Sequence, residues 1–469
     1  MSVLATFMVP HPPMIVPEIG RGSEAQIPET TRAYEQVAGE IAALQPETII
    51  IASPHATMYA DYFHISPGRR AKGSFASFRA PQVSFSEVYD EELVDRICLE
   101  AVEKNFPAGT AGQREPALDH GTMVPLWFIR RSYDDFKLVR IGLSGLPLTD
   151  HYELGMMIQK AVEETGRRVV FVASGDLSHK LQTYGPYGFA PEGPKYDERI
   201  MAACGSGDFG ALFDFDETFC EKAAECGHRS FVMMAGALDG QAVRAKALSH
   251  QDVTGVGYGV CTFYPEGPDE SRHFLADHLR AQEAALTAKA DAADPYVQLA
   301  RASMESYIRE GKRLRLPEGL PAGLLEKLPE EMLHTKAGAF VSIHKHGKLR
   351  GCIGTIAPVT NCVAEEIIRN AVSASTQDPR FDPITEDELK WLEINVDVLG
   401  EPERISSMDE LDVKRYGVIV QSGYRRGLLL PDLDGVDTPE QQVSIALQKG
   451  GIRKSEKYEM ERFEVVRHT

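Results

Sequence analysis

Long hydrophobic runs and a surplus of basic residues are both missing from this 469-residue sequence. No stretch approaches the roughly 18 consecutive apolar residues that a membrane-spanning helix needs, so we expect no membrane segment. Lys and Arg number 50 against 69 Asp and Glu, which gives a formal net charge of −19. Because non-specific nucleic-acid binding depends on neutralising phosphates, we expect no nucleic-acid partner for a chain this acidic.

Cysteine is also sparse, with seven residues and no CxxC pair. An odd number without paired spacing argues against a disulfide framework, and the chain offers no cysteine cluster for an iron–sulfur site. The N-terminal residues lack the basic segment that opens a secretory signal peptide. We therefore expect a cytoplasmic protein with reduced thiols. The remaining composition, 43% hydrophobic and 25% charged, is typical of a folded globular chain.

Short apolar runs alternate with amphipathic stretches over the first half of the chain. Clusters of β-branched and apolar residues predict strands at residues 3–9, 48–52, 137–143 and 168–173. Helical spacing of apolar residues predicts helices at residues 29–44, 91–104 and 151–165. Strands that alternate with helices predict an α/β sandwich around a largely parallel sheet.

A change in composition then marks a domain boundary. Residues 266–269 carry a turn pattern, and the Ala-rich stretch 281–293 predicts a helical connector. We divide the chain into a first domain at 1–265, a linker at 266–289 and a second, smaller domain at 290–469. In the second domain the pattern predicts helices at 296–309 and 362–375, and strands at 339–344, 393–399 and 417–421.

Two histidines follow predicted strands and stand beside prolines. His11 lies in VPHPP at 9–13, and His55 lies in SPH at 53–55. Prolines end the strands there, and strand ends in an open α/β sheet face the crevice where ligands bind. If the two strands are neighbours, the imidazoles converge, which favours a metal or catalytic site over two histidines on surface loops.

A third strand leads into SGDLSH at 174–179, which contains Asp176 and His179. Imidazole titrates near neutral pH, so we interpret His179 as a general base. Asp176 either orients His179 or caps a following helix. His120, in LDHG at 118–121, is a candidate for contacting substrate or an oxygen species.

Glu225 and Cys226 are neighbouring candidates for a further metal ligand. Two histidines and one carboxylate form the facial triad of non-haem Fe(II), which Glu225 would complete. Cys226 would instead give a softer His-His-Cys site that suits iron, copper or zinc. Adjacent residues of an extended chain point in opposite directions, so we expect only one of the two to bind metal.

These motifs together resemble the class III extradiol ring-cleavage dioxygenases, the LigB-like group, and within it the Memo-like branch. The resemblance rests on five motifs in order: VPHPP (9–13), SPH (53–55), LDHG (118–121), SGDLSH (174–179) and ECG (225–227). It covers nearly all of the first domain and implies the α/β sandwich of that family. It also implies an Fe(II) site that binds a catecholate through both oxygens, activates O2 and cleaves the ring beside the diol.

The resemblance further implies a role for each matched residue. His11 and His55 would be metal ligands, and His120 would lie in the oxygen or substrate pocket. His179 would be the base that deprotonates the diol and later protonates an intermediate. Ring-cleaving members carry Glu as the third ligand, whereas the Memo branch carries Cys, which Cys226 matches in its Cys-Gly context. Because a thiolate changes the charge and redox potential of iron, the reaction need not be ordinary catechol cleavage.

Two patterns stand out in the second domain. In LRGCIGT at 349–355, glycines allow a tight turn, and Arg350 would lower the pKa of the Cys352 thiol and make it more nucleophilic. The alternative is a hairpin-like turn around a small buried cysteine. In QDPRFDP at 377–383, a proline-stiffened loop would present Asp378 and Arg380 to a ligand, or would simply end a helix.

LRGCIGT, with DPRF at 378–381 and PIT at 383–385, resembles the AMMECR1 family over residues 290–469. That resemblance implies a compact α+β unit and no established reaction. The two domains in one chain resemble the fusion protein of the AmmeMemoRadiSam system, named for its AMMECR1, Memo and radical-SAM components. It implies a radical-SAM enzyme as a partner, to which any radical chemistry would belong.

Our leading hypothesis is a non-haem Fe(II) dioxygenase that acts with O2 on a small catechol-like aromatic substrate, with copper or zinc as alternative metals. One alternative is an iron- or copper-binding scaffold without turnover, and another is a hydrolase in which the metal activates water. A further alternative, a nucleic-acid site on the second domain, would use Lys345, Lys348, Arg350, Arg425 and Arg426. A homo-oligomer is expected because dimers are the commonest state of such enzymes.

Overall fold

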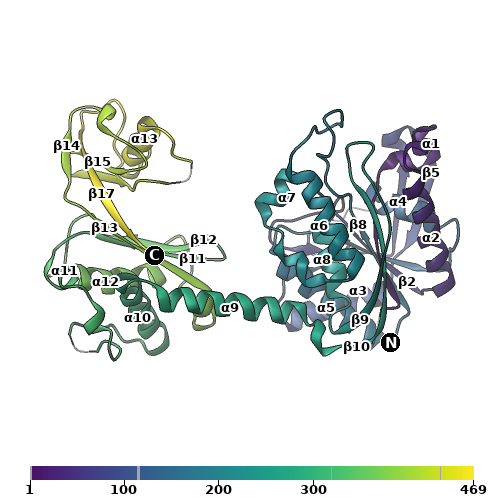
Figure 1. Ribbon diagram of the computed structural model, residues 1–469, viewed down its shortest axis with the longest axis horizontal. Coiled ribbons are helices and arrows are strands. Elements are labelled where there is room, and N and C mark those ends of the chain that lie inside the picture. The colour runs from purple at the N-terminus through teal and green to yellow at the C-terminus, as the bar shows by residue number, and fades with distance from the viewer. Residues whose placement is uncertain (1–2, 114–116, 318, 434) are drawn as a thin grey trace. The chain divides into compact units, whose positions relative to one another are not determined.

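The computed structural model describes residues 3–113, 117–317, 319–433 and 435–469. The chain divides into two compact units, Met1–Leu279 and Arg280–Thr469. The division falls within helix α9 (Phe274–Ala292), in the region where the sequence predicts a helical connector (Figure 1). Among the described residues, no helix has both the length and the apolar character needed to cross a membrane.

Six strands form the central sheet of the first unit, in the order β7-β2-β8-β1-β10-β9. Their bounds are β1 (Ala5–Val9), β2 (Thr48–Ser53), β7 (Lys137–Gly142), β8 (Val169–Ser174), β9 (Gln241–Gln251) and β10 (Tyr258–Pro268). The first four strands in that order are parallel, and β10 and β9 add an antiparallel edge. The prediction of a largely parallel sheet is confirmed, and the four predicted strands correspond to β1, β2, β7 and β8.

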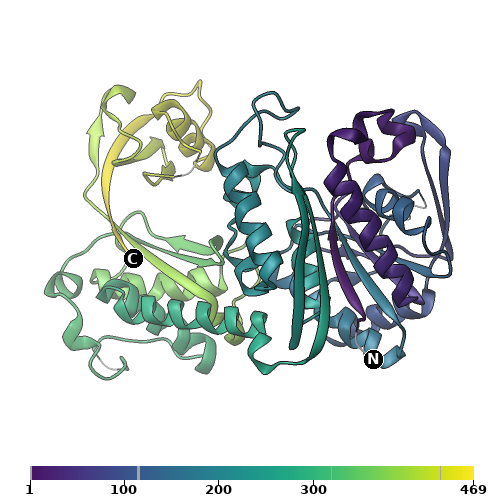
Figure 2. The same cartoon turned by 45° about the vertical axis from the view of Figure 1, so that its right-hand side comes forward.

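Helices cover both faces of this sheet. Successive strand residues point to opposite sides, and both sides carry apolar side chains that must be buried. Phe7 and Ile49 belong to the core cluster that contains α2 and α4, whereas Met8 and Ile50 belong to the cluster that contains α3, α5, α6 and α8. The helices of the unit are α1 (Pro17–Gly20), α2 (Pro28–Leu44), α3 (Glu91–Glu103), α4 (His120–Ile129), α5 (Leu148–Thr165), α6 (Glu192–Ser206), α7 (Glu217–Ala223) and α8 (His228–Gly236). Figure 2 shows this sandwich from a second direction, and the three predicted helices are confirmed as α2, α3 and α5.

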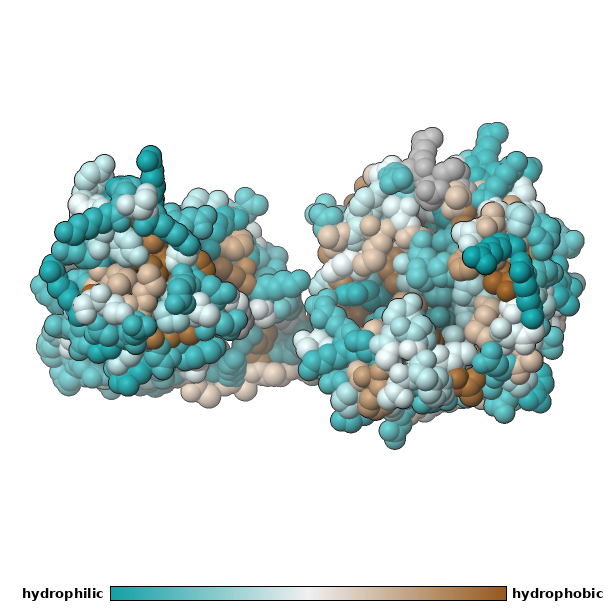
Figure 3. All heavy atoms as spheres, turned by 90° about the horizontal axis from the view of Figure 1, so that it is seen from above, coloured by the Kyte–Doolittle hydropathy of each residue, from teal (hydrophilic) through white to brown (hydrophobic). Residues whose placement is uncertain are grey.

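Two small sheets complete the first unit. Strands β4 (Arg70–Phe75) and β5 (Ala80–Val88) form an antiparallel ribbon, and β3 (Phe63–His64) pairs with β6 (Ala108–Gly109). Residues of the ribbon line a cavity beside the start of α4 (His120–Ile129). Figure 3 shows one face of the molecule, on which hydrophilic residues predominate and hydrophobic residues gather only in small groups.

The second unit is built on an antiparallel sheet with the strand order β12-β11-β13-β17-β15-β16, and β14 also pairs with β17. Its strands are β11 (Ala339–Lys345), β12 (Lys348–Gly354), β13 (Leu392–Leu399), β14 (Glu403–Ile405), β15 (Tyr416–Ser422), β16 (Arg425–Leu429) and β17 (Glu459–His468). Its helices are α10 (Pro295–Glu310), α11 (Glu330–His334), α12 (Val363–Thr376) and α13 (Pro439–Lys449). The expected α+β unit is confirmed, with one apolar core beneath α10 and α12 and another beneath α13.

Candidate metal centre

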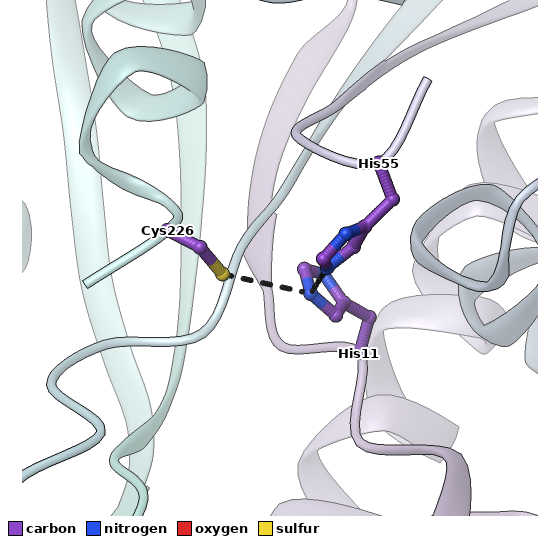
Figure 4. A group of neighbouring side chains, drawn as sticks. All are labelled: His11, His55 and Cys226. Atoms are coloured by element: carbon purple, nitrogen blue, oxygen red, sulfur yellow. Dashed lines mark hydrogen bonds between the residues drawn. The ribbon is translucent and has the colours of Figure 1, made fainter. Parts of the chain in front are cut away.

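Three neighbouring parallel strands end at one edge of the first unit's sheet. Since β2, β8 and β1 are adjacent in that order, the loops that follow them meet outside their carboxyl ends, where α/β sheets bind ligands. His11 follows β1, His55 follows β2, and His179 lies five residues beyond β8. Cys226 reaches the same place from the turn before α8, and Figure 4 shows its sulfur and the two imidazoles pointing toward one another.

The donor atoms of His11, His55 and Cys226 converge on one point. The Nε2 atoms of His11 and His55 are 3.0 Å apart, and the Cys226 Sγ lies 3.6 Å from the His11 Nε2. All three donor atoms lie within 4.8 Å of one another. A metal that binds nitrogen at about 2.1 Å and sulfur at about 2.3 Å holds neighbouring donors about 3 to 4 Å apart, so this group fits a metal ion.

The candidate centre is open on one side. His11 is buried, Cys226 is partly exposed and His55 is exposed. Structural metal sites are closed by four protein ligands, whereas catalytic sites keep a position for water or substrate. Three protein donors with a solvent-facing side therefore match the catalytic kind of site.

Glycines allow the segments around the centre to approach one another. A Cβ on Gly175 would lie 2.1 Å from the Gly227 Cα, so a side chain there would push the Cys226 turn away from the end of β8. A Cβ on Gly121 would lie 2.4 Å from the Ser53 Oγ, at the place where α4 begins beside the end of β2. The close placement of Cys226 and of the start of α4 thus depends on the missing side chains at these glycines.

Ser174 determines which nitrogen of His11 carries the proton. Its hydroxyl donates to the Gly121 carbonyl oxygen at 2.6 Å, so the Ser174 oxygen is left to accept from the His11 Nδ1–H at 2.9 Å. The lone pair of the His11 Nε2 is then free to bind a metal, on the side where the His55 Nε2 and the Cys226 Sγ lie. This is the hydrogen bond that a metal-ligating histidine usually makes with its second nitrogen.

A second network supports His55 and His120. The Asp119 carboxylate accepts hydrogen bonds from the Ser53 hydroxyl at 2.6 Å and from the Thr122 N–H at 2.9 Å, and it lies 3.5 Å from the buried Arg140 guanidinium. The Ser53 Oγ in turn accepts the His55 N–H at 3.2 Å. Ser53, Asp119 and Ser174 were not among the residues predicted from the sequence. The available signal was their position at a strand end or directly before a candidate histidine.

Loss of water around the rings favours the neutral imidazoles. It lowers the pKa of His11, and also that of His55 although its side chain reaches solvent, and with the neighbouring His55 it lowers the pKa of His120 to about 4. Neutral imidazole is the form that binds metal. Burial also raises the pKa of the Cys226 thiol well above its usual value. A cation in contact with the sulfur would reverse this preference and stabilise the thiolate.

Glu225 is directed elsewhere. Its carboxylate accepts the His228 N–H at 2.6 Å and so caps the first turn of α8. Among the described residues, the group that could hold a metal contains Cys226 and not Glu225. Of the two ligands that the sequence left open, the geometry therefore favours Cys226.

His179 and Asp176 lie together beside the centre. The His179 Nδ1 donates to the Ala224 carbonyl oxygen, which leaves Nε2 unprotonated and 4.0 Å from the Asp176 carboxylate. Asp176 also accepts the His11 N–H at 2.7 Å. The alternative that the Asp176 side chain caps a following helix is wrong, because residues 175–182 form no helix and the carboxylate instead accepts the His11 N–H.

A cavity of about 900 Å³ opens next to His120, between the β4–β5 ribbon and the start of α4. The His120 ring lies 4.0 Å from the His55 ring and 5.5 Å from the Phe78 ring, measured between centroids. Phe85 and Met123 add further apolar lining. The cavity is therefore a place where a planar ring would lie close to the candidate centre.

The second unit brings three of its four candidate residues together. The Asp378 carboxylate accepts the Cys352 N–H at 2.9 Å and pairs with the Arg380 guanidinium at 2.7 Å. Arg380 also donates to the Cys352 carbonyl oxygen at 3.3 Å. The loop at 377–383 thus presents Asp378 and Arg380 to the strand that carries Cys352.

Arg350 does not belong to this group. Its guanidinium pairs with the Glu388 carboxylate at 2.9 Å and donates to the Asp382 carbonyl oxygen at 2.8 Å. The strand register is irregular at Arg350, which is skipped in the pairing of β12 with β11. The expected turn at 349–355 is also wrong: residues 349–354 belong to β12, and the turn before it uses His346 and Gly347, both with positive φ. Burial raises the pKa of the Cys352 thiol, so the expected activation by Arg350 is not observed.

The cations proposed for a nucleic-acid site mostly have carboxylate partners. Lys345 and Arg350 share Glu388, Arg425 pairs with Glu456, and Arg426 pairs with Glu461 at 2.9 Å. A cation already neutralised by a carboxylate gains little from a phosphate. This arrangement gives the nucleic-acid alternative no support, and the absence of a nucleic-acid partner stays a prediction.

Comparisons with known proteins agree with this description. The family model of the catalytic LigB subunit of aromatic ring-opening dioxygenase matches residues 5–261, and the AMMECR1 family model matches residues 297–468. Protein CA_C1420 of Clostridium acetobutylicum is 42% identical over 475 residues, which cover 100% of this chain and 99% of that protein. A Thermotoga maritima protein is 48% identical over 176 residues, which cover 37% of this chain and 97% of that protein.

Two solved structures resemble parts of the chain. The uncharacterized protein PH0010 from Pyrococcus horikoshii is 29% identical, covers 37% of this chain and 88% of its own, and has a TM-score of 0.33. The uncharacterized protein JW3007 from Escherichia coli K12 is 16% identical, covers 55% of this chain and 99% of its own, and has a TM-score of 0.38.

Proposed function

Because this chain belongs to the family of the catalytic LigB subunit of aromatic ring-opening dioxygenase, with an AMMECR1 domain after it, we propose that it is a metal-dependent dioxygenase. The substrate class is a small catechol-like aromatic, and the reaction is extradiol-type oxidative cleavage. One observation carries the proposal: the donor atoms of His11, His55 and Cys226 converge at the open edge of the sheet.

His11, His55 and Cys226 would hold the metal, for which we propose Fe(II). When bound there, Fe(II) supplies positions for the two diol oxygens and for O2 and transfers electrons between them. Two imidazoles and one thiolate differ from the usual two-histidine, one-carboxylate set in charge and softness. Copper and zinc are therefore the alternative metals for this donor set.

The chain's own residues then handle the substrate and its protons. The His179 Nε2 takes a proton from a diol hydroxyl, since its Nδ1 is already committed to the Ala224 carbonyl oxygen. Asp176, 4.0 Å away, stabilises the imidazolium that results. His120 and Phe78 contact the aromatic ring at the mouth of the cavity.

Partners and location stay part of the proposal. The resemblance to the AmmeMemoRadiSam fusion supports a radical-SAM enzyme as a partner. The cysteine usage supports a reducing cytoplasm as the location, and a homo-oligomer is proposed because dimers are the commonest state of such enzymes. An iron or copper scaffold without turnover, and a zinc hydrolase that activates water, are the alternatives that an experiment has to separate.

The test measures bound metal and O2 uptake on the same protein. Anaerobically prepared protein is reconstituted with Fe(II), then offered catechol and substituted catechols in an oxygen electrode. We expect one metal per chain, uptake that requires a diol, and loss of uptake with retained iron in His179→Ala. His334→Ala is the matched control, because that histidine is 75% exposed and pairs only with Glu330 among the described residues.

Each other outcome decides between the alternatives. Metal binding without uptake on any diol contradicts the dioxygenase and favours the scaffold. Activity that zinc supports without oxygen favours the hydrolase. If the protein binds no metal, or if metal binding survives the loss of both His11 and His55, the proposed metal site is contradicted.

A further inference from the structure

A cavity in the second unit is lined by three arginines that have no carboxylate partner among the described residues. The cavity has a volume of about 400 Å³ and lies between α12 and the segment that follows α10. Arg313 and Arg315 come from that segment, and Arg369 comes from α12. Within the described part of the chain, no Asp or Glu lies in ion-pair distance of these three guanidinium groups. The cavity therefore gathers three guanidinium groups that lack an ion pair in the described part of the chain, although the chain has a net charge of −19.

The helical neighbour that would neutralise Arg369 is turned away from it. Glu365 stands four residues before Arg369, at the spacing where Glu and Arg usually pair on a helix. Its carboxylate instead accepts the Asn361 N–H at 3.0 Å, at the start of α12. Arg369 is thus left facing the cavity, and one carboxylate stands at the rim against three guanidiniums.

A second cavity in the same unit is also lined by arginines, but these arginines have a carboxylate partner. It has a volume of about 440 Å³ and contains Arg301 and Arg309. Both pair with Glu305, at 3.5 Å and 3.2 Å. The lack of such pairs around Arg313, Arg315 and Arg369 is therefore a property of one cavity and not of this unit's arginines in general.

The floor of the cationic cavity is apolar. Leu314, Ile368 and Val372 line it and are 8%, 6% and 0% exposed. A free inorganic anion would use the arginines but would leave this floor uncovered. A ligand with an anionic head and an apolar body would satisfy both parts.

We propose that this cavity binds an organic phosphomonoester. Three guanidiniums and one carboxylate give a net charge of +2, which matches the dianion of a phosphomonoester near neutral pH. Guanidinium presents planar donors that suit phosphate oxygens in pairs. The proposed site lies in the second unit and is independent of the metal centre and of the function proposed for it.

The test is calorimetric titration of the full chain with phenyl phosphate, inorganic phosphate and phenol. We expect phenyl phosphate to bind more tightly than inorganic phosphate, and phenol not to bind. Arg369→Gln should weaken phenyl phosphate binding by roughly 10-fold or more, as expected for one charge-assisted hydrogen-bonding partner. Arg309→Gln is the matched control and should leave binding unchanged, and so should His55→Ala at the metal centre.

The pH dependence gives an independent reading. Because the second phosphate proton binds with a pKa of about 6, binding should be stronger at pH 8 than at pH 5, where the ligand carries one charge less. Equal affinity for phosphate and phenyl phosphate would contradict the role of the apolar floor. No binding by the intact chain, or equal losses in Arg369→Gln and Arg309→Gln, would overturn the proposal.

Discussion

Cys226 and Cys352 both have thiols with a raised pKa, yet their surroundings differ in kind. Cys226 faces two neutral imidazoles, so its sulfur is one of three donors on a common point. Cys352 accepts a hydrogen bond from the Ser342 hydroxyl at 3.2 Å, and the nearby arginine is held by Asp378. The three donor atoms around Cys226 could bind a cation, whereas beside Cys352 the charge of Arg380 is already balanced by Asp378.

This contrast teaches that neighbours in the sequence are poor guides to neighbours at a site. Glu225 stands next to Cys226 but caps a helix, and Arg350 stands near Cys352 but binds Glu388. The residues that do contact these cysteines come from other segments. His11, for example, is 215 positions from Cys226.

The largest expected effect comes from removing a donor of the candidate centre. His11→Ala or Cys226→Ala should reduce metal affinity by more than the roughly 10- to 100-fold that outer partners cost. Cys352→Ala should leave the metal affinity unchanged, since no imidazole contacts that thiol in the described part of the chain. Metal content after anaerobic reconstitution and desalting measures both. Equal metal loss in Cys226→Ala and Cys352→Ala would erase the contrast between the two cysteines.

Removing the hydrogen bond behind a ligand should have the next largest effect. Ser174→Ala frees the His11 Nδ1 from its acceptor and should weaken metal binding by roughly 10- to 100-fold. Ser230→Ala is the matched control, because that buried hydroxyl has no hydrogen-bond partner among the described residues. A competition titration with a chelator gives the affinities. Equal affinities for the two variants would show that Ser174 does not orient His11.

The charge balance around Cys352 predicts its reactivity. Burial raises the thiol pKa, Arg380 lowers it, and Asp378 raises it again. Asp378→Asn should therefore lower the pKa and speed alkylation by iodoacetamide at pH 7.5 by roughly threefold, about half a pKa unit. Mass spectrometry of labelled peptides follows the rate, with Cys226 in the same sample as the control. A slower reaction would show that Asp378 positions Arg380 more than it opposes it.

The smallest effect concerns the ion pair that holds Arg350 away from Cys352. Burial alone would raise the pKa of Glu388, but hydrogen bonds from Arg350 and Lys345 outweigh it and lower that pKa to about 2. A carboxyl with a lowered folded-state pKa stabilises the fold above its ordinary pKa of about 4.3 and loses this contribution as pH falls toward 2. Arg350→Gln should thus cost about 1 kcal/mol at pH 7 and progressively less below pH 4.

Urea unfolding measures this difference in a Trp127→Phe background, so that Trp391 reports on the second unit. Arg404→Gln serves as the control, because its pair with Glu459 is well exposed and should contribute little. A destabilisation by Arg350→Gln that persists unchanged at pH 2.5 would contradict a role through Glu388 ionisation.

The sequence alone determined the architecture and the first list of candidate residues. Apolar periodicity is a local property, so strands and helices such as β2 and α5 could be predicted from short windows. The strand-end positions of His11 and His55 followed from the same windows and their prolines. In a parallel sheet such positions meet at one edge, whatever the details of the loops.

Only the tertiary structure decided which side chains share a site. The choice of Cys226 over Glu225 depended on the direction of each side chain at a turn, which contacts with distant segments determine. The proton on His11 depended on Ser174 and on the Gly121 carbonyl oxygen, which belong to two other segments. Among the described residues Arg369 has no carboxylate partner, because the Glu365 carboxylate accepts the Asn361 N–H and does not pair with its helical neighbour. In each case one side chain could bond to several partners, and which partner it takes depends on residues that are distant in the sequence but close in space. A local sequence pattern does not contain that information.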